Sequence, residues 1–281
     1  MAEPTEAFRG GVAVITGAGS GIGEGLARAA AALGMRVVLA DIAADRIERV
    51  AAEIREQGGT AIPVPTDVAE PAALERLAAT VHERLGAVRL LINNAGIETI
   101  GLAWELSAEA WERVVRINVL GVIHGVRAFA PRLLAAGQPA FIANVASVGA
   151  FGMMPVQNPY VMSKHAVLSF TEGLRMEMEL VGAPISVSVV TPGPVNTRIF
   201  RDAALGGESA AKHQSQMQAM LGAGISGDEA ARRILAGIAS REFWVSTHAE
   251  LTAGMAKARA EHLATLSTPA LTPALRALLR G

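Results

Sequence analysis

The sequence predicts an α/β fold: a Rossmann-type, doubly wound parallel sheet in a single domain that spans residues 1–281. Two observations lead to this prediction. Short β-branched runs alternate with longer segments rich in Ala, Leu, Glu and Arg over residues 1–190, and the short runs do not alternate apolar with polar residues. Because strands that are apolar on both sides must be covered on both faces, this order indicates right-handed βαβ units with helices above and below the sheet.

Each predicted element follows from its local pattern. Apolar residues recur at helical spacing between the short runs, as at Ile47, Val50, Ala51 and Ile54. The six short runs are the predicted strands of the sheet: Val12–Thr16, Arg36–Asp41, Ala61–Pro65, Leu90–Asn93, Ala140–Ala146 and Ile185–Val190.

The pattern changes after residue 193. Residues 201–224 are rich in Gly, Ala, Gln, Ser and Met with little periodicity, so we expect a mobile substrate-side segment over about residues 197–224. Residues 243–281 are expected to supply a C-terminal strand, a helix and a tail. The predicted elements are a helix over Asp228–Ala239, a strand over Phe243–Ser246 and a helix from His248 to about Leu266.

The composition excludes several classes of function. The 281 residues are 51% hydrophobic and carry a net charge of −1, so the chain has material for a core but no basic patch for nucleic acid or an anionic membrane. Cysteine is absent, which excludes disulfides, thiolate metal sites and a cysteine nucleophile. The N-terminus lacks the basic and apolar regions of a signal peptide, and Arg, Asp or Glu interrupts the apolar stretches. We therefore expect a cytoplasmic protein with no nucleic-acid or membrane partner.

A glycine-rich turn follows the first predicted strand, from Thr16 to Gly23, in the pattern T-G-x-x-x-G-x-G. Glycines let the backbone approach a pyrophosphate, and the N-terminus of the following helix offers free N–H groups and a partial positive charge. Asp41 ends the second strand, where a carboxylate accepts hydrogen bonds from a ribose diol. Taken singly, the loop is equally compatible with an empty turn, and Asp41 with an ordinary helix-capping residue.

Tyr160 and Lys164 stand four residues apart at the start of a helical pattern, which places them on one face of the helix. A nearby ammonium group stabilises phenolate and is expected to lower the pKa of the tyrosine. Ser147 follows the fifth predicted strand, where its hydroxyl can bind a substrate oxygen. Each residue alone has a plainer interpretation: a half-buried aromatic, a solvated lysine and a turn serine.

Two further asparagine positions carry information. Asn118 interrupts a helix with one apolar face, so it marks a kink, a polar group that holds a water, or an exposed surface residue. The sequence Asn93-Asn94-Ala95-Gly96 follows the fourth strand and in isolation indicates a turn.

Together these motifs resemble the short-chain dehydrogenase/reductase family, over roughly residues 10–200 and in the family's order and spacing. The motifs that carry the resemblance are TGAGSGIG, Asp41, Asp67-Val68, NNAG, Asn118, Ser147, YVMSK and PGPVNT. The resemblance implies that Tyr160 is the general acid/base and that Lys164 lowers its pKa and binds the nicotinamide ribose. It further implies that Ser147 orients the substrate oxygen and that Asn118 holds a water that links Lys164 to solvent.

The resemblance also implies a binding site for NAD and no metal. Gly17, Ser20, Ile22 and Gly23 would lie along the pyrophosphate, while Asp67 and Val68 would flank the adenine and Asn94 would lie near the adenine-side ribose. The Val195 backbone and the Thr197 hydroxyl would hold the carboxamide. Asp41 is expected to select NAD over NADP, because the nearest basic residue, Arg46, lies on a helix where Asp45 and Glu48 match its charge.

The resulting expectation is an NAD-dependent alcohol dehydrogenase or ketone reductase that acts on a hydrophobic secondary alcohol or ketone as a homotetramer. The expected pocket wall is largely apolar, with Glu98 and Gln157 as polar contacts or as solvated side chains. Its apolar members are Ile97, Phe151, Met153, Met154, Val195, Ile199, Phe200, Met217 and Met220. A non-catalytic NAD-binding sensor and an epimerase on the same fold are the alternatives; the intact set of Ser147, Tyr160 and Lys164 argues against the sensor.

Overall fold

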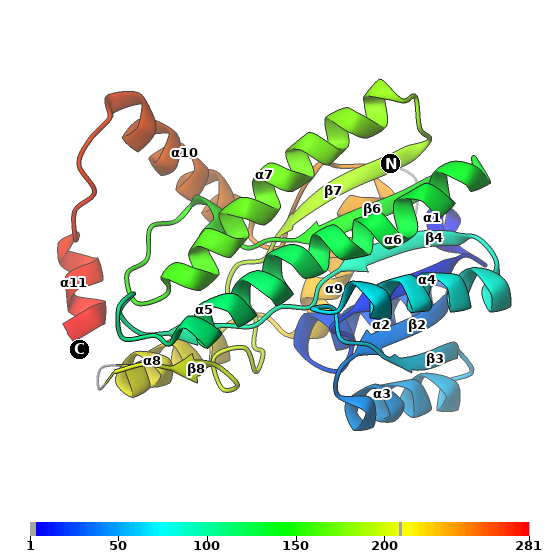
Figure 1. Cartoon of the computed structure of the whole chain (residues 1–281), viewed down its shortest axis with the longest axis horizontal. Coiled ribbons are helices and arrows are strands. Elements are labelled where there is room, and N and C mark those ends of the chain that lie inside the picture. The colour runs from blue at the N-terminus through cyan, green and yellow to red at the C-terminus, as the bar shows by residue number, and fades with distance from the viewer. Residues whose placement is uncertain (1–3, 208–209, 281) are drawn as a thin grey trace.

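A seven-stranded parallel sheet forms the centre of the computed structural model, which describes residues 4–207 and 210–280 (Figure 1). The strand order is β3-β2-β1-β4-β6-β7-β9, so the order reverses between β1 and β4, where doubly wound sheets open a crevice for ligands. This confirms the predicted fold class. The strands are β1 (Val12–Thr16), β2 (Arg36–Asp41), β3 (Thr60–Pro65), β4 (Val88–Asn93), β6 (Ala140–Val145), β7 (Ile185–Thr191) and β9 (Trp244–Ser246).

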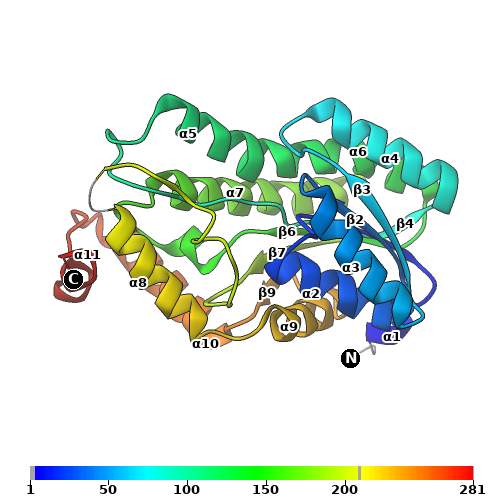
Figure 2. The same ribbon diagram turned by 90° about the horizontal axis from the view of Figure 1, so that it is seen from below.

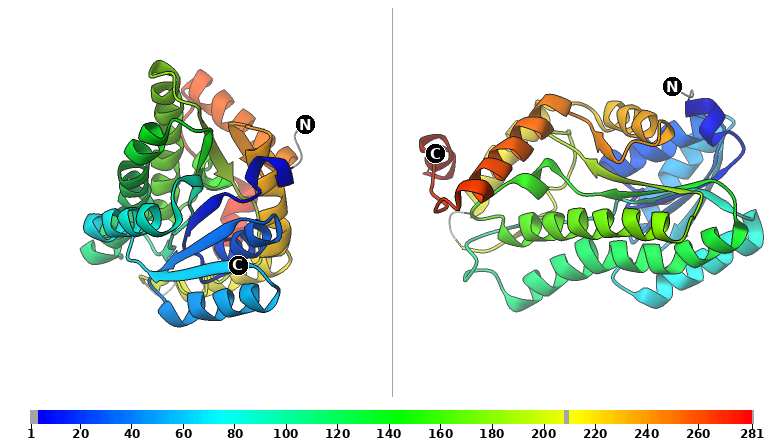
Figure 3. Two further views of the ribbon diagram at one scale, coloured as in Figure 1. Left: turned by 90° about the vertical axis from the view of Figure 1, so that its right-hand side faces the viewer. Right: turned by 90° about the horizontal axis from the view of Figure 1, so that it is seen from above.

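Helices cover both faces of this sheet (Figures 2 and 3). One face carries α2 (Gly21–Ala32), α3 (Ala44–Glu56) and α9 (Gly227–Ala239), and the other carries α4 (Pro71–Leu85), α6 (Gly121–Ala136) and α7 (Asn158–Leu180). Along β1, Ala13 and Ile15 are buried in the first layer, whereas Val12 and Val14 are buried in the second. Both sides of each strand therefore need apolar residues, which explains the uninterrupted β-branched runs.

The helix that enters the second layer is interrupted by a π-helical turn. The helix α5 (Ala108–Val114) continues into the π turn Val115–Leu120 and then into α6. By length and hydropathy, the whole stretch Ala108–Ala136 would suffice to cross a membrane, although 44% of its most apolar window is buried inside this molecule. The side of α6 that packs on β4 and α4 accounts for much of this apolar character.

A smaller parallel sheet lies beside the carboxyl ends of the main strands. It pairs β5 (Thr99–Ile100) with β8 (Ala204–Leu205), and α8 (Ala210–Gly222) packs against it (Figure 1). The expectation of little regular structure over residues 201–224 is wrong for α8, whereas residues 208 and 209 lie outside the described residues. His213, Met217 and Leu221 are buried four residues apart on one face of α8, and the polar histidine obscured this helical period.

The C-terminal region contains the predicted strand and helix. After β9, α10 (Ala249–Thr265) extends away from the sheet with no buried residue, and α11 (Pro273–Arg280) contacts α8 (Figure 1). The sequence did not predict α11, nor the N-terminal helix α1 (Pro4–Phe8), whose Phe8 is fully buried against Phe141.

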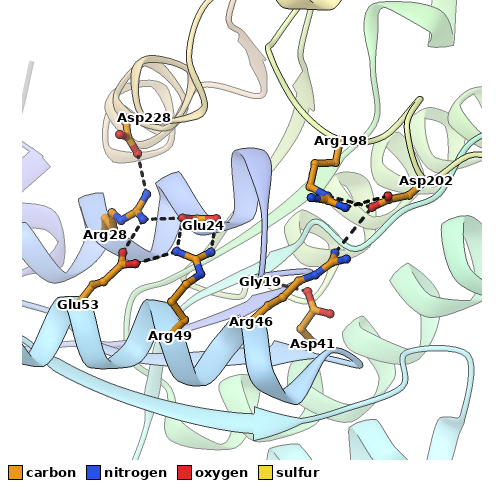
Figure 4. A network of polar contacts seen from close by, with 10 residues as sticks. All are labelled: Gly19, Glu24, Arg28, Asp41, Arg46, Arg49, Glu53, Arg198, Asp202 and Asp228. Carbon is orange, nitrogen blue, oxygen red and sulfur yellow. Dashed lines mark hydrogen bonds and ion pairs between the residues drawn. The ribbon is translucent and has the colours of Figure 1, made fainter. Parts of the chain in front are cut away.

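The helix that carries the glycine-rich loop is held against α9 by a close backbone contact. A Cβ atom on Gly25 would lie 2.5 Å from the carbonyl oxygen of Gly227, and one on Gly227 would lie 2.5 Å from that of Gly21. An ion-pair network ties α2 to its neighbours: Arg28 contacts Glu24 at 2.5 Å, Glu53 of α3 at 2.6 Å and Asp228 of α9 at 3.7 Å (Figure 4). Both features fix the start of α2.

We predict that Gly25→Ala destabilises the protein by about 1–3 kcal/mol, because the added methyl group must push α2 away from α9. Gly254→Ala is the matched control: Gly254 lies inside α10, and apart from its own helix backbone no atom lies within 4 Å of the position that its added methyl group would occupy. That control should stabilise the protein by about 0.5–1 kcal/mol through helix propensity. Urea unfolding of both variants measures the difference, and equal stabilities would contradict the close contact.

Candidate active site

The glycine-rich loop between β1 and α2 has the backbone that its residue types require. Gly17 and Gly21 have φ values of +66° and +56°, in the left-handed region that favours glycine. A Cβ atom on Gly23 would collide with the carbonyl oxygen of Gly17. Ser20 is the N-cap of α2 and makes no side-chain cap hydrogen bond, while Ile22 lies in the first turn. The loop thus forms a cradle at a helix N-terminus, and this cradle fits a pyrophosphate.

Asn94 holds this loop in place from the end of β4. Its Nδ2 donates hydrogen bonds to the carbonyl oxygens of Thr16 at 2.9 Å and Gly17 at 3.2 Å. In return, the Thr16 hydroxyl oxygen accepts hydrogen bonds from the backbone N–H groups of Asn94 and Ala95. The NNAG motif therefore fixes the glycine loop. Nothing in the sequence pattern indicates this role for Asn94.

The Asp41 carboxylate points toward the glycine-rich loop (Figure 4). Its Oδ2 accepts a hydrogen bond from the Gly19 N–H at 2.9 Å, and its Oδ1 accepts one from the Ala43 N–H at 3.0 Å. Arg46 lies next to it, within 3.0 Å of a Cβ position on Gly19. The partner of Arg46 is neither Asp45 nor Glu48, as the sequence suggested, but Asp202 at 3.7 Å.

Asp67 and Val68 follow β3, the strand that pairs with β2, and precede α4. The Asp67 Oδ1 accepts a hydrogen bond from the Ala69 N–H at 2.9 Å, which fixes the turn. Val68 is 7% exposed and packs so closely on α6 that a Cβ atom at Gly121 would lie 2.9 Å from it.

Ser147, Tyr160 and Lys164 come together at the carboxyl end of β6. Ser147 lies two residues beyond the strand, and its Oγ accepts a hydrogen bond from the Gly149 N–H at 3.0 Å. Lys164 is 3% exposed, and its Nζ donates to the Val145 carbonyl oxygen at 2.9 Å. The same ammonium lies 5.4 Å from the centre of the Tyr160 ring. The helix α7 thus presents phenol and ammonium one turn apart, as their spacing predicts.

Asn118 lies in the π-helical turn and is completely buried. Its Oδ1 accepts from the Ile97 N–H and its Nδ2 donates to the Ile97 carbonyl, both at 2.9 Å. Nδ2 also lies 3.0 Å from the Ser163 hydroxyl, which in turn donates to the Tyr160 carbonyl. Of the interpretations left open, the structure supports a distorted helix; π turns often occur at functional sites.

The pKa values around Tyr160 are governed by burial. Burial raises the pKa of Tyr160, the charge of Glu98 raises it further, and a hydrogen bond with Ser147 opposes both. Burial also lowers the pKa of Lys164 to about 8, against the opposing effect of Glu98. The expectation that the ammonium lowers the pKa of Tyr160 is therefore wrong for this arrangement, because desolvation disfavours phenolate more than the nearby groups favour it.

The PGPVNT segment closes the site from the end of β7. Val195 is 2% exposed and pairs with Ile225. The Thr197 methyl group lies 2.9 Å from a Cβ position on Gly21, so this segment packs directly on the glycine-rich loop.

The apolar pocket wall expected from the sequence is divided in the structure. Phe200 and Met217 are buried with Ile100 in one apolar cluster, against which Ile199 packs. Met153 and Met154 instead line a separate groove of about 470 Å³ on the outer side of α7, together with Met162, His165 and Arg259. Met220 is 44% exposed. The first of these two groups lies beside β5, which directly follows Glu98, and beside α8.

Three buried polar residues near β5 extend the site. Glu98 and Gln157, which the sequence left undecided between pocket and solvent, are 2% and 5% exposed. The Gln157 Nε2 lies 2.9 Å from Nε2 of His213, a residue that no sequence signal indicated. Within residues 4–207 and 210–280, no group of three or more His, Asp or Glu side chains forms a metal site.

A search against family models matches residues 11–206, more than half of the chain, to the short chain dehydrogenase model. The chain is 35% identical over 240 residues to the 1-deoxy-11-beta-hydroxypentalenate dehydrogenase of Streptomyces avermitilis, covering 85% of this chain and 84% of that protein. It is 30% identical over 259 residues to the C alpha-dehydrogenase of Sphingobium sp. SYK-6, covering 89% and 84%.

Among solved structures, a short chain dehydrogenase/reductase from Burkholderia phymatum in complex with NAD superposes with a TM-score of 0.90 and 36% identity, over 94% of this chain and 98% of that one. The family model covers the glycine-rich loop, Asp41 and Asn118. It also covers Ser147, Tyr160 and Lys164. The chain therefore belongs to the short-chain dehydrogenase/reductase family and is an oxidoreductase of that family.

Proposed function

We propose that this protein transfers a hydride between NAD(H) and a hydrophobic secondary alcohol or ketone. The observation that carries the proposal is the convergence of Ser147, Tyr160 and Lys164 at the carboxyl end of β6, beside the glycine-rich loop. A protein that only sensed NAD would need the loop but not these three side chains, and no observation favours an epimerase. The names of both curated relatives describe dehydrogenases, which supports the reaction type.

The residues present fit a dinucleotide. The first turn of α2 would hold the pyrophosphate with backbone N–H groups, and Asp41 would accept hydrogen bonds from the adenine-side ribose. Asp67 and Val68 would flank the adenine, the Val195 backbone and Thr197 hydroxyl would hold the carboxamide, and Lys164 would bind the second ribose. The bound nicotinamide supplies the hydride acceptor or donor and, when oxidised, a positive charge.

The protein residues move the proton. During oxidation the carbinol O–H proton passes to Tyr160 as the phenolate, while the hydride leaves the carbinol carbon; reduction runs in reverse with Tyr160 as the acid. Ser147 orients the substrate oxygen. Because burial raises the pKa of Tyr160, the phenol is protonated before ligands bind, and that form is ready to protonate a ketone.

The substrate proposal rests on the apolar cluster of Ile100, Ile199, Phe200 and Met217 next to β5. Apolar walls with a few polar groups are typical of sites for small hydrophobic molecules. We therefore propose an apolar ring or chain around the reacting carbon rather than a sugar or a phosphorylated metabolite. We also propose a cytoplasmic location, which is the expectation from the sequence.

We predict that Tyr160→Phe lowers kcat by about 10²–10⁴-fold on any active secondary alcohol, with binding of NAD nearly unchanged, because only the acid/base group is lost. A panel of aryl, alicyclic and polyol alcohols, followed by NADH absorbance, measures turnover, and calorimetry measures binding of NAD. Glu177→Gln, an exposed residue of the same helix, is the matched control. More than a tenth of wild-type kcat in Tyr160→Phe would disprove the assignment, and faster turnover of a polyol than of every apolar alcohol would disprove the substrate class.

We predict that the enzyme prefers NAD over NADP because of Asp41. A 2′-phosphate would bring negative charge to this carboxylate, and two like charges about 4 Å apart cost about 1 kcal/mol in water and about 4 kcal/mol at an effective dielectric of 20. Since about 1.4 kcal/mol is tenfold, kcat/KM should favour NAD by roughly ten- to a thousandfold. Asp41→Asn should reduce the preference at least tenfold, whereas the exposed Asp45→Asn should leave it unaltered. An unchanged ratio in Asp41→Asn would assign the selection to another residue.

We propose a homotetramer, as the family resemblance implies. Supporting this, the outer face of α7 exposes Met162 (46%), Met176 (66%) and Leu180 (85%), and several large exposed apolar side chains on one helix face are typical of a subunit interface. Multi-angle light scattering at micromolar concentration should give four times the mass of the chain. Met176→Glu with Leu180→Glu should shift the mass to that of a smaller species; a wild-type monomer would contradict the proposal.

A further inference from the structure

Glu98 is a buried carboxyl group that the proposed mechanism does not use. Its side chain is 2% exposed, and Oε1 accepts a hydrogen bond from the Thr99 N–H at 2.9 Å. The other oxygen, Oε2, is buried without a hydrogen-bond partner. Because an unpartnered buried polar atom costs free energy, such a group in a native site needs a partner, which a bound water or a ligand supplies.

The carboxyl group is held between the catalytic residues and the substrate-side segment. Asn118 binds both backbone groups of Ile97, so the chain is fixed one residue before Glu98. The Glu98 carbonyl then accepts a hydrogen bond from the Ala204 N–H at 3.4 Å, across the small sheet. The charge of Glu98 acts on both Tyr160 and Lys164, so the side chain lies near the groups that handle the reacting oxygen.

The protonation state of Glu98 defines what it can bind. Burial raises its pKa to about 8, against the Thr99 hydrogen bond and the charge of Lys164. Lys164 forms no direct ion pair with it among the described residues and donates to Val145 instead. At neutral pH the group is therefore mostly a carboxylic acid, whose free Oε2 can donate one hydrogen bond and accept another. A neutral donor and acceptor suits a neutral oxygen.

We propose that Glu98 determines specificity by hydrogen-bonding a second, neutral oxygen of the substrate, close to the reacting carbon. The substrate class is then an apolar secondary alcohol or ketone with a further hydroxyl or carbonyl group, rather than a simple alcohol or an amino alcohol. This inference rests on the proposed function.

Two neighbouring elements also carry buried polar atoms without a hydrogen-bond partner. The Thr99 Oγ1 of β5 and the His213 Nδ1 of α8 are buried without a partner. Because the Gln157 amide nitrogen can only donate, the facing His213 Nε2 accepts, and the ring proton lies on Nδ1. A ligand with more than one oxygen offers hydrogen-bond partners for such atoms.

The test compares three alcohols that differ in one group: 1-phenylethanol, 1-phenylethane-1,2-diol and 2-amino-1-phenylethanol. We expect Glu98→Leu to lower kcat/KM about tenfold more on the diol than on 1-phenylethanol, because one hydrogen bond is lost in a buried site. Glu98→Gln keeps a donor and an acceptor, so its differential loss should be about threefold. Glu105→Gln, an exposed carboxylate in the following loop, is the control for the amide change.

Two outcomes would overturn the proposal. Equal losses on all three alcohols would mean that Glu98 acts on the chemical step and not on substrate choice. A loss confined to the amino alcohol would mean that Glu98 is an ionised partner for a cation. Circular dichroism reports whether Glu98→Leu folds, and if it does not, the threefold differential of Glu98→Gln decides.

Failure of the proposed function can be distinguished from failure of the proposed role of Glu98. If the wild type oxidises none of the three alcohols with NAD or NADP, the proposed reaction fails for this class. Binding of acetophenone and 2-hydroxyacetophenone in the presence of NADH, measured by calorimetry, then tests Glu98 alone. About tenfold weaker binding of the hydroxyketone alone to Glu98→Leu supports the proposal, and equal binding to wild type and variant overturns it.

Discussion

The site depends on a buried ammonium group. Lys164 is 3% exposed, and in the described structure its hydrogen bond goes to the Val145 carbonyl at the end of β6. A buried charge is tolerated only where polar groups surround it, so β6 must end where Lys164 reaches it. This requirement sets the register of α7 against the sheet, and with it the position of Tyr160 one turn earlier. Asn118 completes the arrangement, because its side chain connects Ile97 to Ser163 and thereby connects the segment after β4 to the second turn of α7.

The cofactor side and the substrate side of the molecule meet through few contacts. Thr197 packs on Gly21, and Arg46, beside the loop that Asp41 holds, pairs with Asp202 of the substrate-side segment (Figure 4). Asp202 also pairs with Arg198 at 3.2 Å, so both basic residues share one carboxylate. These side chains are 38–45% exposed, so the pairs contribute little stability in water. Their consequence is positional: the guanidinium group of Arg46 is directed toward Asp202.

The sequence predicts those parts of the site that follow from short spacing. The glycine loop, Asp41 and the Tyr160–Lys164 pair lie on one loop or one helix, and the structure brings them to the expected places. The predicted lowering of the Tyr160 pKa is wrong, because the pKa is raised by burial, and burial depends on packing from segments that are distant in the sequence. The helix α8 was not predicted, because the buried His213 interrupts the apolar period of its inner face. The ion-pair partner of Arg46, and the segment that pairs with the backbone of Glu98 and helps to bury it, lie about a hundred or more positions away in the sequence. The local sequence pattern therefore does not predict either feature.

The proposed role of Glu98 follows from the electrostatics around Tyr160. Burial raises the pKa of Glu98 and of Tyr160 and lowers that of Lys164, so each shift favours the uncharged form of its group. An added anionic group on the substrate would have to be desolvated in this buried site, and an added cation would have to ionise Glu98 against its burial. Either step costs free energy that a neutral oxygen avoids, because a neutral carboxylic acid can both donate to it and accept from it. A neutral oxygenated substrate is therefore the one that pairs the free oxygen of Glu98 without creating a charge in the buried site.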